Sequence, residues 1–380
     1  MARRDPALVI ASRSRIIVLP RGYTLMEVLL ALSLSLALVS GVLSLSVGAQ
    51  HSTAALAARA RAQENLQLAF GLIERVVQHG GNFACAHPQR PLVSFLNGEW
   101  PQIPEYDLTR PVLGYEALGG GQFAPDPALT LRLSGAGGDQ RVHKAGHGVD
   151  LGVIESNSDI LVIRGSGPAV PLAAPVVGRE SITVPEHVAD FVVDDVVLIS
   201  DCEQAALVKI THVTDTADGR LLGWAAGPGV FDNTTVGRVH GAEATSDSLA
   251  LLARGFAADA SVAAVTSWIF YLAPSLVRSR QGQSVSALWL KSGADPSVEM
   301  IAGITDLQVW FLVAEDANPD ARMGYFQAGQ LTPDALVVGL RIMLRSSSVD
   351  ELTEVGQWPV STSASRTFML PRFGRWGHAS

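Results

Sequence analysis

Residues 21–50 of the chain read RGYTLMEVLLALSLSLALVSGVLSLSVGAQ, and this stretch decides the architecture. It contains no charged side chain from Val28 to Ala49, and Glu27 at its beginning is its one carboxylate. About 20 apolar residues are enough to cross a bilayer as a helix. The apolar region of a cleaved secretory signal peptide is shorter, about 7–15 residues. The stretch therefore predicts a transmembrane helix.

Positive charge is concentrated before this apolar run. Five arginines precede it: Arg3, Arg4, Arg13, Arg15 and Arg21. Only Asp5 offsets them. Basic residues keep their side of a membrane segment in the cytoplasm, so the rest of the chain is expected across the membrane. The sequence thus predicts a single-pass protein with a cytoplasmic N-terminus and an exported domain.

The position of Glu27 needs a reason, because a carboxylate in a spanning helix costs a few kcal/mol and is by default functional. No basic residue within one helical turn downstream can pair with it. If the chain is cut between Gly22 and Tyr23, a new α-amine appears four residues before Glu27. A neighbouring subunit can then offer its own amine to this acid, which predicts that Glu27 is an assembly contact.

The segment Gly22-Tyr23-Thr24-Leu25-Met26-Glu27, with its basic leader and apolar helix, resembles the signal of type IV prepilins and type II secretion pseudopilins. The resemblance implies cleavage after Gly22 by a prepilin peptidase, N-methylation of Tyr23 and a mature chain with Glu27 as its fifth residue. Glycine suits a narrow protease cleft because it has no Cβ. Tyr23 replaces the more usual phenylalanine, and the long leader suggests that the true start codon lies downstream of Met1.

A periodic pattern continues the helix beyond the apolar run. Leu66, Phe70, Ile73 and Val77 recur every three or four residues, which predicts one amphipathic helix to about Gln78. The sequence His79-Gly80-Gly81 then predicts its end. The expected organisation is a cleaved leader over residues 1–22, a transmembrane and spine helix over 23–79 and a β-rich exported domain over 80–380.

Downstream of Gly81 the apolar runs are short and are punctuated by Gly and Pro, which favours strands over helices. The expected strands cover residues 129–133, 159–165, 190–200, 206–213, 267–272, 287–290, 306–313 and 335–344. The turn-rich connections 114–128 and 214–248 are predicted to be loops with little regular structure. The fold class is therefore α+β, a long N-terminal helix packed on a β-rich globular domain as in pilins.

Several of these segments resemble the PilW family of minor pilins, in that family's order and over most of residues 1 to about 373. They are GGNFACAHP, SDILVIRGS, DDVVLISDCEQAALVKIT, VEMIAGITDLQVWFLV, GYFQAG, LVVGLRIMLRS and SRTFMLPRF. The resemblance implies a structural subunit that primes type IV pilus assembly and sits at or near the pilus tip. Its implied partners are other minor pilins, the major pilin, prepilin peptidase and the inner-membrane assembly platform. The implied location is the inner membrane and then the pilus on the cell surface.

The chain has two cysteines, Cys85 and Cys202, in the segment expected outside the cytoplasm. An oxidising compartment allows one disulfide between them, which would tie the end of the spine helix to a strand. The alternative is two unrelated buried thiols.

Other chemistry is weakly supported. His143 and His147 have metal-ligand spacing, but neighbouring glycines argue against a helix there, so a solvated loop is favoured. Asp316, Asn318 and Asp320 have Ca²⁺-loop spacing, yet the glycine and the bidentate glutamate of an EF-hand are missing. No nucleophile elbow or phosphate-binding loop is present, so no enzyme activity, cofactor or metal is predicted. A formal net charge of −8 and the absence of a basic cluster after the leader argue against nucleic-acid binding.

Two alternatives to a minor pilin remain at this stage. A minor pseudopilin of a type II secretion system would have the same N-terminal features: the basic leader, the cleavage site, Glu27 and the apolar helix. A membrane-tethered periplasmic enzyme or ligand-binding module shares only the anchor, and it predicts no processing at Gly22 and tolerance of Glu27→Ala.

Overall fold

The computed structural model describes residues 23–370 apart from 84–85, 87–91, 99–103, 109, 126–130, 134–148, 174–179, 187–189, 230, 241–254, 258, 280–281, 294, 316–321, 333–334 and 350–359. The chain divides into two units, Met1–Ala54 and Ala55–Ser380. The division falls inside a helix, because the second part of that helix packs into the β-rich unit.

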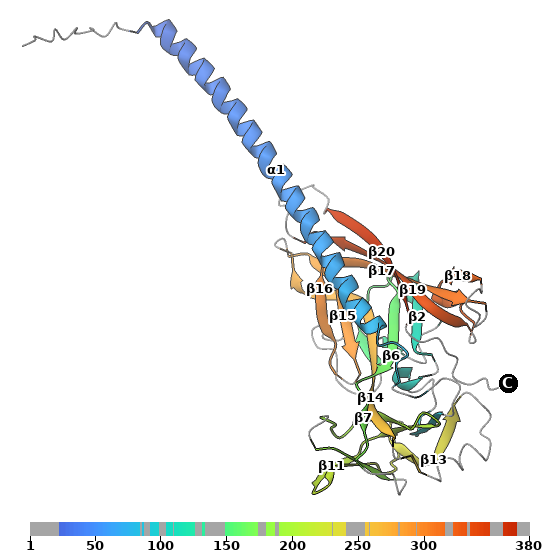
Figure 1. Cartoon of the computed structure of the whole chain (residues 1–380). Coiled ribbons are helices and arrows are strands. Elements are labelled where there is room, and N and C mark those ends of the chain that lie inside the picture. Colours follow the sequence, from blue (N-terminus) through green and yellow to red (C-terminus); the bar gives the residue numbers. More distant parts are fainter. Residues whose placement is uncertain are drawn as a thin grey trace, which may run out of the picture. The chain divides into compact units, whose positions relative to one another are not determined.

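Helix α1 runs from Leu25 to Val77 (Figure 1). Thr24, the residue before the helix, caps its N-terminus. Its hydroxyl oxygen accepts a hydrogen bond from the Glu27 N–H at 3.2 Å, the usual role of an N-cap threonine. Its apolar part contains hydroxyl groups, and these bond back to carbonyls one turn earlier, as Ser33 does to Leu30 and Ser44 to Gly41. The hydroxyl groups of these two serines are therefore hydrogen-bonded within the helix itself. The prediction of a long N-terminal helix followed by a β-rich region is confirmed.

The helix ends at Val77, one residue before the predicted Gln78, and the predicted stop sequence His79-Gly80-Gly81 lies in the turn that follows. Gly81 adopts φ 71°, a left-handed conformation that glycine takes at no steric cost, and its N–H donates to the Arg164 carbonyl at 2.9 Å. A Cβ on Gly165 would collide with the His79 carbonyl. Glycine at 165 therefore lets the end of α1 lie directly against the strand that carries Arg164.

The second part of α1 contributes one face to the main core. Leu66, Ala69, Phe70, Ile73 and Val77 are all at most 4% exposed, whereas Leu68 between them is 55% exposed. They pack with apolar residues of two different sheets. The three- and four-residue spacing read from the sequence thus corresponds to a single buried helix face.

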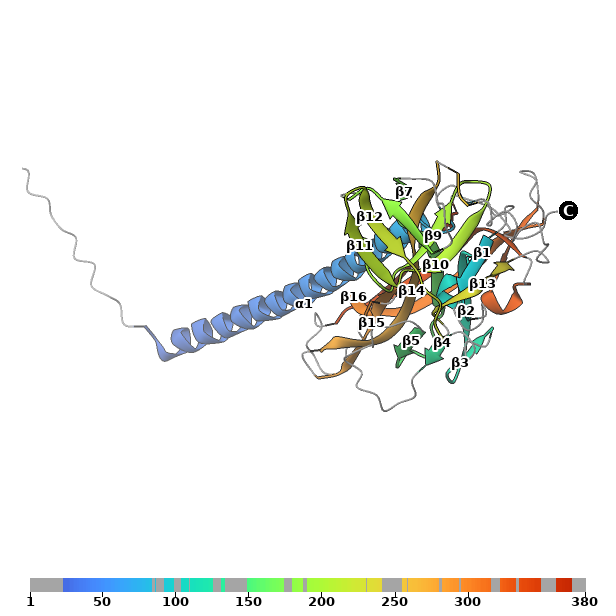
Figure 2. The same cartoon turned by 90° about the horizontal axis from the view of Figure 1, so that it is seen from below.

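The largest sheet has eleven strands, of which eight follow the order β13-β1-β10-β9-β14-β6-β2-β3 (Figures 1 and 2). The other three strands lie off this path. Strands β7 and β15 pair with β14, and β16 pairs with β15. The bounds are β1 Leu92–Leu96, β2 Val112–Gly119, β3 Gln122–Ala124, β6 Ile160–Ser166, β7 Val170–Pro171, β9 Val196–Ser200, β10 Ala205–Lys209, β13 Asn233–His240, β14 Ser261–Arg278, β15 Ser284–Ser292 and β16 Val298–Ala302.

Strand β14 holds this sheet together. Its first residues pair with β9, Val262 opposite Ile199, and its later residues pair with β6 and β15, Ile269 lying between Val162 and Lys291. One strand therefore connects the part of the sheet beside α1 with the part that contains β1, β9, β10 and β13.

A four-stranded antiparallel sheet, β18-β17-β19-β20, covers the helix core. Its bounds are β17 Ile304–Ala314, β18 Met323–Phe326, β19 Leu336–Ser347 and β20 Ser361–Met369. The smaller sheets are β11-β12-β8, with bounds His212–Thr216, Gly219–Gly223 and Ser181–Val184, and the parallel pair β4 (Leu131–Leu133) and β5 (Val149–Gly152). Two 3₁₀ turns, η2 at Pro104–Tyr106 and η4 at Ala328–Gln330, complete the described elements.

Some expected loops and strands are wrong, among them the strand over 206–213, which is divided between β10 and β11 in two different sheets. The connections 114–128 and 214–248 contain most of β2 and all of β3, β12 and β13. Their glycines, which are typical of loops, form tight hairpin turns with positive φ at Gly119 and Gly219. The strand expected over 190–200 begins only at Val196, because Asp194 adopts φ 77° and turns the chain.

Candidate functional site

The first turn of α1 presents the predicted assembly residue in the open. Tyr23 is 80% exposed, and Glu27 is exposed in the first helical turn. The Glu27 carboxylate forms no hydrogen bond or ion pair with the described part of the chain, although its own N–H is capped by Thr24. Gly22, the other half of the predicted cleavage site, lies outside the described residues.

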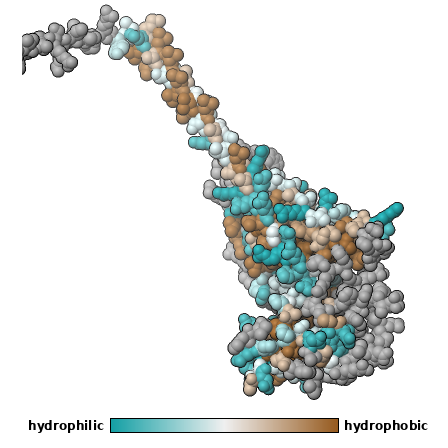
Figure 3. All heavy atoms as spheres, in the orientation of Figure 1, coloured by the Kyte–Doolittle hydropathy of each residue, from teal (hydrophilic) through white to brown (hydrophobic). Residues whose placement is uncertain are grey.

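The helix after Glu27 is apolar on every side. Every Leu, Val and Met from Leu25 to Val47 is exposed, and Figure 3 shows hydrophobic residues along this part of α1. The next charged side chain after Glu27 is Arg59. The segment is long and apolar enough to span a membrane, and none of it is buried within the chain. Soluble monomers rarely expose so large a contiguous apolar surface, so this one is built to be covered by lipid or by other helices.

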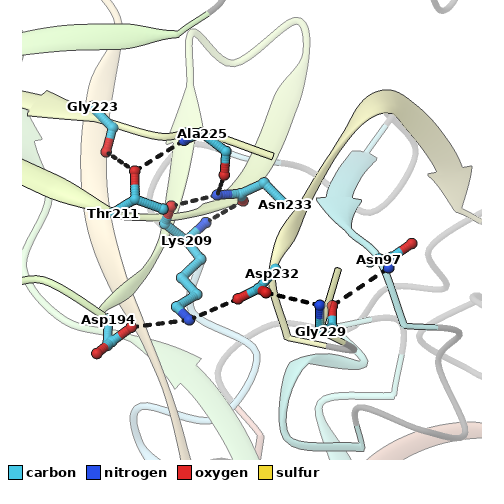
Figure 4. A network of polar contacts seen from close by, with 9 residues as sticks. All are labelled: Asn97, Asp194, Lys209, Thr211, Gly223, Ala225, Gly229, Asp232 and Asn233. Carbon is cyan, nitrogen blue, oxygen red and sulfur yellow. Dashed lines mark hydrogen bonds and ion pairs between the residues drawn. The ribbon is translucent and has the colours of Figure 1, made fainter. Parts of the chain in front are cut away.

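A second cluster of charged groups is centred on Lys209, at the end of β10 (Figure 4). Its ammonium group lies between Asp194, at 2.9 Å, and Asp232, at 3.2 Å. The other oxygen of Asp232 accepts a hydrogen bond from the Gly229 N–H at 2.8 Å. Burial would lower the pKa of Lys209, but hydrogen bonds to the two carboxylates outweigh it and raise that pKa. The lysine therefore stays charged.

Asn233 completes the cluster from the first position of β13. Its side-chain oxygen accepts from the Lys209 N–H, and its amide donates to the Lys209 carbonyl, both at 2.8 Å. The same amide reaches the Ala225 carbonyl at 3.3 Å (Figure 4). These bonds mimic a strand pairing at Lys209, beyond Leu207, where the pairing of β10 with β1 ends. The cluster thus fixes Ala225, Gly229 and Asp232 to the sheet, a structural role, since its charges are satisfied internally.

A buried arginine lies on β6, where the end of α1 contacts the sheet. Arg164 is 1% exposed and donates from Nη1 to the Arg110 carbonyl at 2.6 Å. Burial lowers its pKa, opposed chiefly by the negative charge of Asp107, which is also buried. Asp107 forms an ion pair with Arg110 at 2.9 Å. A buried charge with compensating neighbours is costly to disturb, so this cluster fixes Asp107 and Arg110 against β6.

Asp159 joins the two large sheets at the position before β6. Its carboxylate accepts hydrogen bonds from the Ala117 N–H on β2, at 2.9 Å, and from the Val309 N–H on β17, at 2.8 Å. Its own N–H donates to the Leu307 carbonyl at 2.8 Å. Burial raises the pKa of Asp159 to about 6, although the two N–H donors act in the opposite direction.

We expect the pH dependence of stability to report this carboxyl group. Because its folded-state pKa lies above its ordinary value of 3.8, its stabilising contribution is full below 3.8 and is lost as pH rises through about 6. The free energy of unfolding of the wild type, measured relative to Asp159→Asn, should therefore fall between pH 4 and 7. Urea unfolding of the detergent-solubilised chain at several pH values measures the difference. Parallel curves for the two proteins would contradict the assignment.

Cys202 is disulfide-bonded, and no described cysteine is free. The sequence contains one other cysteine, Cys85, which lies outside the described residues, so the pairing of these two residues stays a prediction. The weak calcium candidates Asp316, Asn318 and Asp320 and the histidines His143 and His147 also lie outside the described residues. Within the described ranges, no three His, Cys, Asp or Glu side chains gather as metal ligands would.

Sequence reasoning missed the charged groups of the exported domain. Asp159 and Arg164 stand inside the apolar run 159–166, and a charge within a buried strand pattern is the signal that could have identified them. Lys209 also lies inside an expected strand, 206–213, but its two acidic partners come from other segments of the chain and could not be identified from that strand.

Comparison with known proteins gives no relative, since no family model, no curated protein and no solved structure matches the chain.

Proposed function

We propose that the protein is a minor pilin of the PilW type, a structural subunit that joins other minor pilins in the membrane to prime a type IV pilus and stays at or near its tip. The observation that carries the proposal is Glu27, a carboxylate without a partner in the described chain, at the head of an apolar helix that is exposed on all sides.

The chemistry of this arrangement favours assembly over simple anchoring. An anchor needs only apolar side chains, and a carboxylate among them costs free energy unless a cation neutralises it. The α-amine of a processed neighbouring chain is a cation of suitable size at the same depth of the membrane. Helix α1 joins this contact to the β-rich unit, because its second part is built into the core of that unit.

Co-isolation from membranes tests the proposal. The full-length chain, tagged at its C-terminus and solubilised in mild detergent, should bring along proteins that share its N-terminal signature, a glycine followed five residues later by Glu within an apolar run. Surface filaments should also become fewer when the gene is deleted. A chain that is isolated alone, or only with soluble proteins, would point to a tethered periplasmic module instead. Co-isolation with unchanged filaments and lost protein secretion would identify the pseudopilin alternative.

A further inference from the structure

The sheet β18-β17-β19-β20 has one covered face and one open face. Side chains alternate between the faces, and Val309, Leu340 and Ile342 point into the core around α1. The residues that alternate with these along each strand point away from the core and form what we call the outer face. Its main members are Met323, Tyr325, Arg341, Met343, Arg345 and Met369.

The outer face exposes large apolar side chains on its two edge strands, β18 and β20. Met323 is 50% exposed, Tyr325 45% and Met369 52%. Single exposed apolar residues are ordinary, but here they share one sheet face with two exposed arginines. Tyr, Met and Arg are the residues enriched in protein–protein interfaces, where Lys, Glu and Asp are depleted.

The arginines of this face have no acidic partner among the residues that the structure describes. Arg341 lies over the ring of Tyr325, with 5.7 Å from its guanidinium carbon to the ring centre. The Tyr325 hydroxyl is 3.4 Å from the Thr367 hydroxyl, which holds the ring across the face. Neither Arg341 nor Arg345 forms an ion pair with a described residue. Asp306 stands opposite Arg345, yet its carboxylate accepts a hydrogen bond from Gln308 at 2.9 Å.

We infer that the outer face binds a second exported protein, through a surface that sets Asp or Glu carboxylates among apolar side chains. The apolar residues supply contact area, and an incoming carboxylate would meet a guanidinium already oriented by its aromatic neighbour. The partner is a different protein, because a second copy docked through the same face would set the arginines of the two copies against each other. The inference does not depend on the assembly role of Glu27.

Photo-crosslinking in the native membrane tests the inference. A benzophenone amino acid in place of Met323 should form a cross-link to a different protein, at a peptide that contains Asp or Glu. The same amino acid in place of Leu276, which is 57% exposed on β14, is the matched control and should not form that cross-link. The yield should fall when salt is raised from about 0.1 to 1 M, since the screening length shortens from about 10 to 3 Å.

Charge variants then assign the contact to Arg341. We expect Arg341→Glu to lower the cross-link yield about tenfold, and Arg341→Gln to lower it less. Arg278→Glu reverses an exposed charge on β14 and should leave the yield unchanged. Equal protease resistance of these three variants and of the parent protein with benzophenone at position 323 shows that none has lost its fold.

Each contrary result overturns the inference. These results are no cross-link at Met323, a cross-link only to another copy of the chain, a yield indifferent to salt, or a yield that Arg341→Glu leaves unchanged in a folded protein. Recovery of the chain on anionic vesicles through the same arginines, in place of a protein cross-link, would assign the face to lipid and likewise overturn it.

Discussion

Glu27→Ala is expected to abolish incorporation of the protein into filaments or priming complexes, while membrane insertion, export and the stability of the β-rich unit stay as in the wild type. If the carboxylate pairs with the α-amine of a neighbouring subunit in an apolar setting, its removal leaves that amine unpaired. Breaking a buried ion pair costs about 3–5 kcal/mol, which corresponds to a loss of association of at least a hundredfold.

The structure gives Glu27 a second candidate role, capping of the helix N-terminus, which the experiment has to separate from pairing with an amine. Thr24 and Glu27 stand three residues apart, the spacing of a capping box, and the Thr24 hydroxyl already accepts the Glu27 N–H. A glutamine at 27 keeps the capacity to cap the helix and loses the charge. Glu27→Gln should therefore fail to assemble like Glu27→Ala if the charge is what matters. Normal assembly of Glu27→Gln would show that helix capping is the role of this residue.

Two measurements on each variant make the outcome decisive. Co-isolation with partner subunits reports assembly, and protease resistance of the exported unit reports folding. Glu64→Ala removes another exposed acid of α1 and should behave as the wild type in both. Wild-type incorporation of Glu27→Ala would reject the assembly role, and loss of protease resistance together with incorporation would assign the defect to misfolding.

Phe70→Ala is expected to produce the largest loss of stability, about 3–5 kcal/mol, because it removes a buried aromatic side chain and leaves a cavity. Phe70 is 1% exposed and lies in the core that α1 shares with both large sheets. Its ring centre is 6.3 Å from that of Phe368 on β20, and the Arg366 guanidinium carbon lies 5.2 Å from its centre. The variant loses these contacts in addition to the buried area.

Leu68→Ala is the matched control for this prediction. It shortens another large side chain on the same turn of α1, but Leu68 is 55% exposed, so the free energy of unfolding should change by no more than about 0.5 kcal/mol. Urea unfolding of the detergent-solubilised chain, followed by tryptophan fluorescence, measures both variants. Equal effects at positions 68 and 70 would mean that α1 does not pack through the face described.

The helix could be predicted from sequence because its signals are local. The uninterrupted apolar run, the three- and four-residue spacing after Asn65 and the glycines at 80 and 81 all act within a few residues of one another. The strand pairing could not be predicted, since β1 lies parallel to β10 and β14 joins strands from distant segments. The hairpins β2-β3 and β11-β12 were missed because their glycines were read as signs of irregular loops.

The functional residues, too, could be identified from the sequence only in part. Glu27 could be singled out because a lone charge in an apolar run is visible without a structure. The outer face could not, because Tyr325, Arg341 and Met369 come together only through the register of three separate strands. The same holds for Asp159, whose two donors lie on strands of different sheets.

The measurement that tests the central claim most directly is the mass of the N-terminal peptide of the protein isolated from its own membranes. The account predicts that the peptide begins at Tyr23 and carries one methyl group on its α-amine, which places a cation four residues before Glu27 in every subunit. A peptide that still contains Arg21 and Gly22 would contradict the account, because no new amine would then exist to pair with the carboxylate of a neighbour.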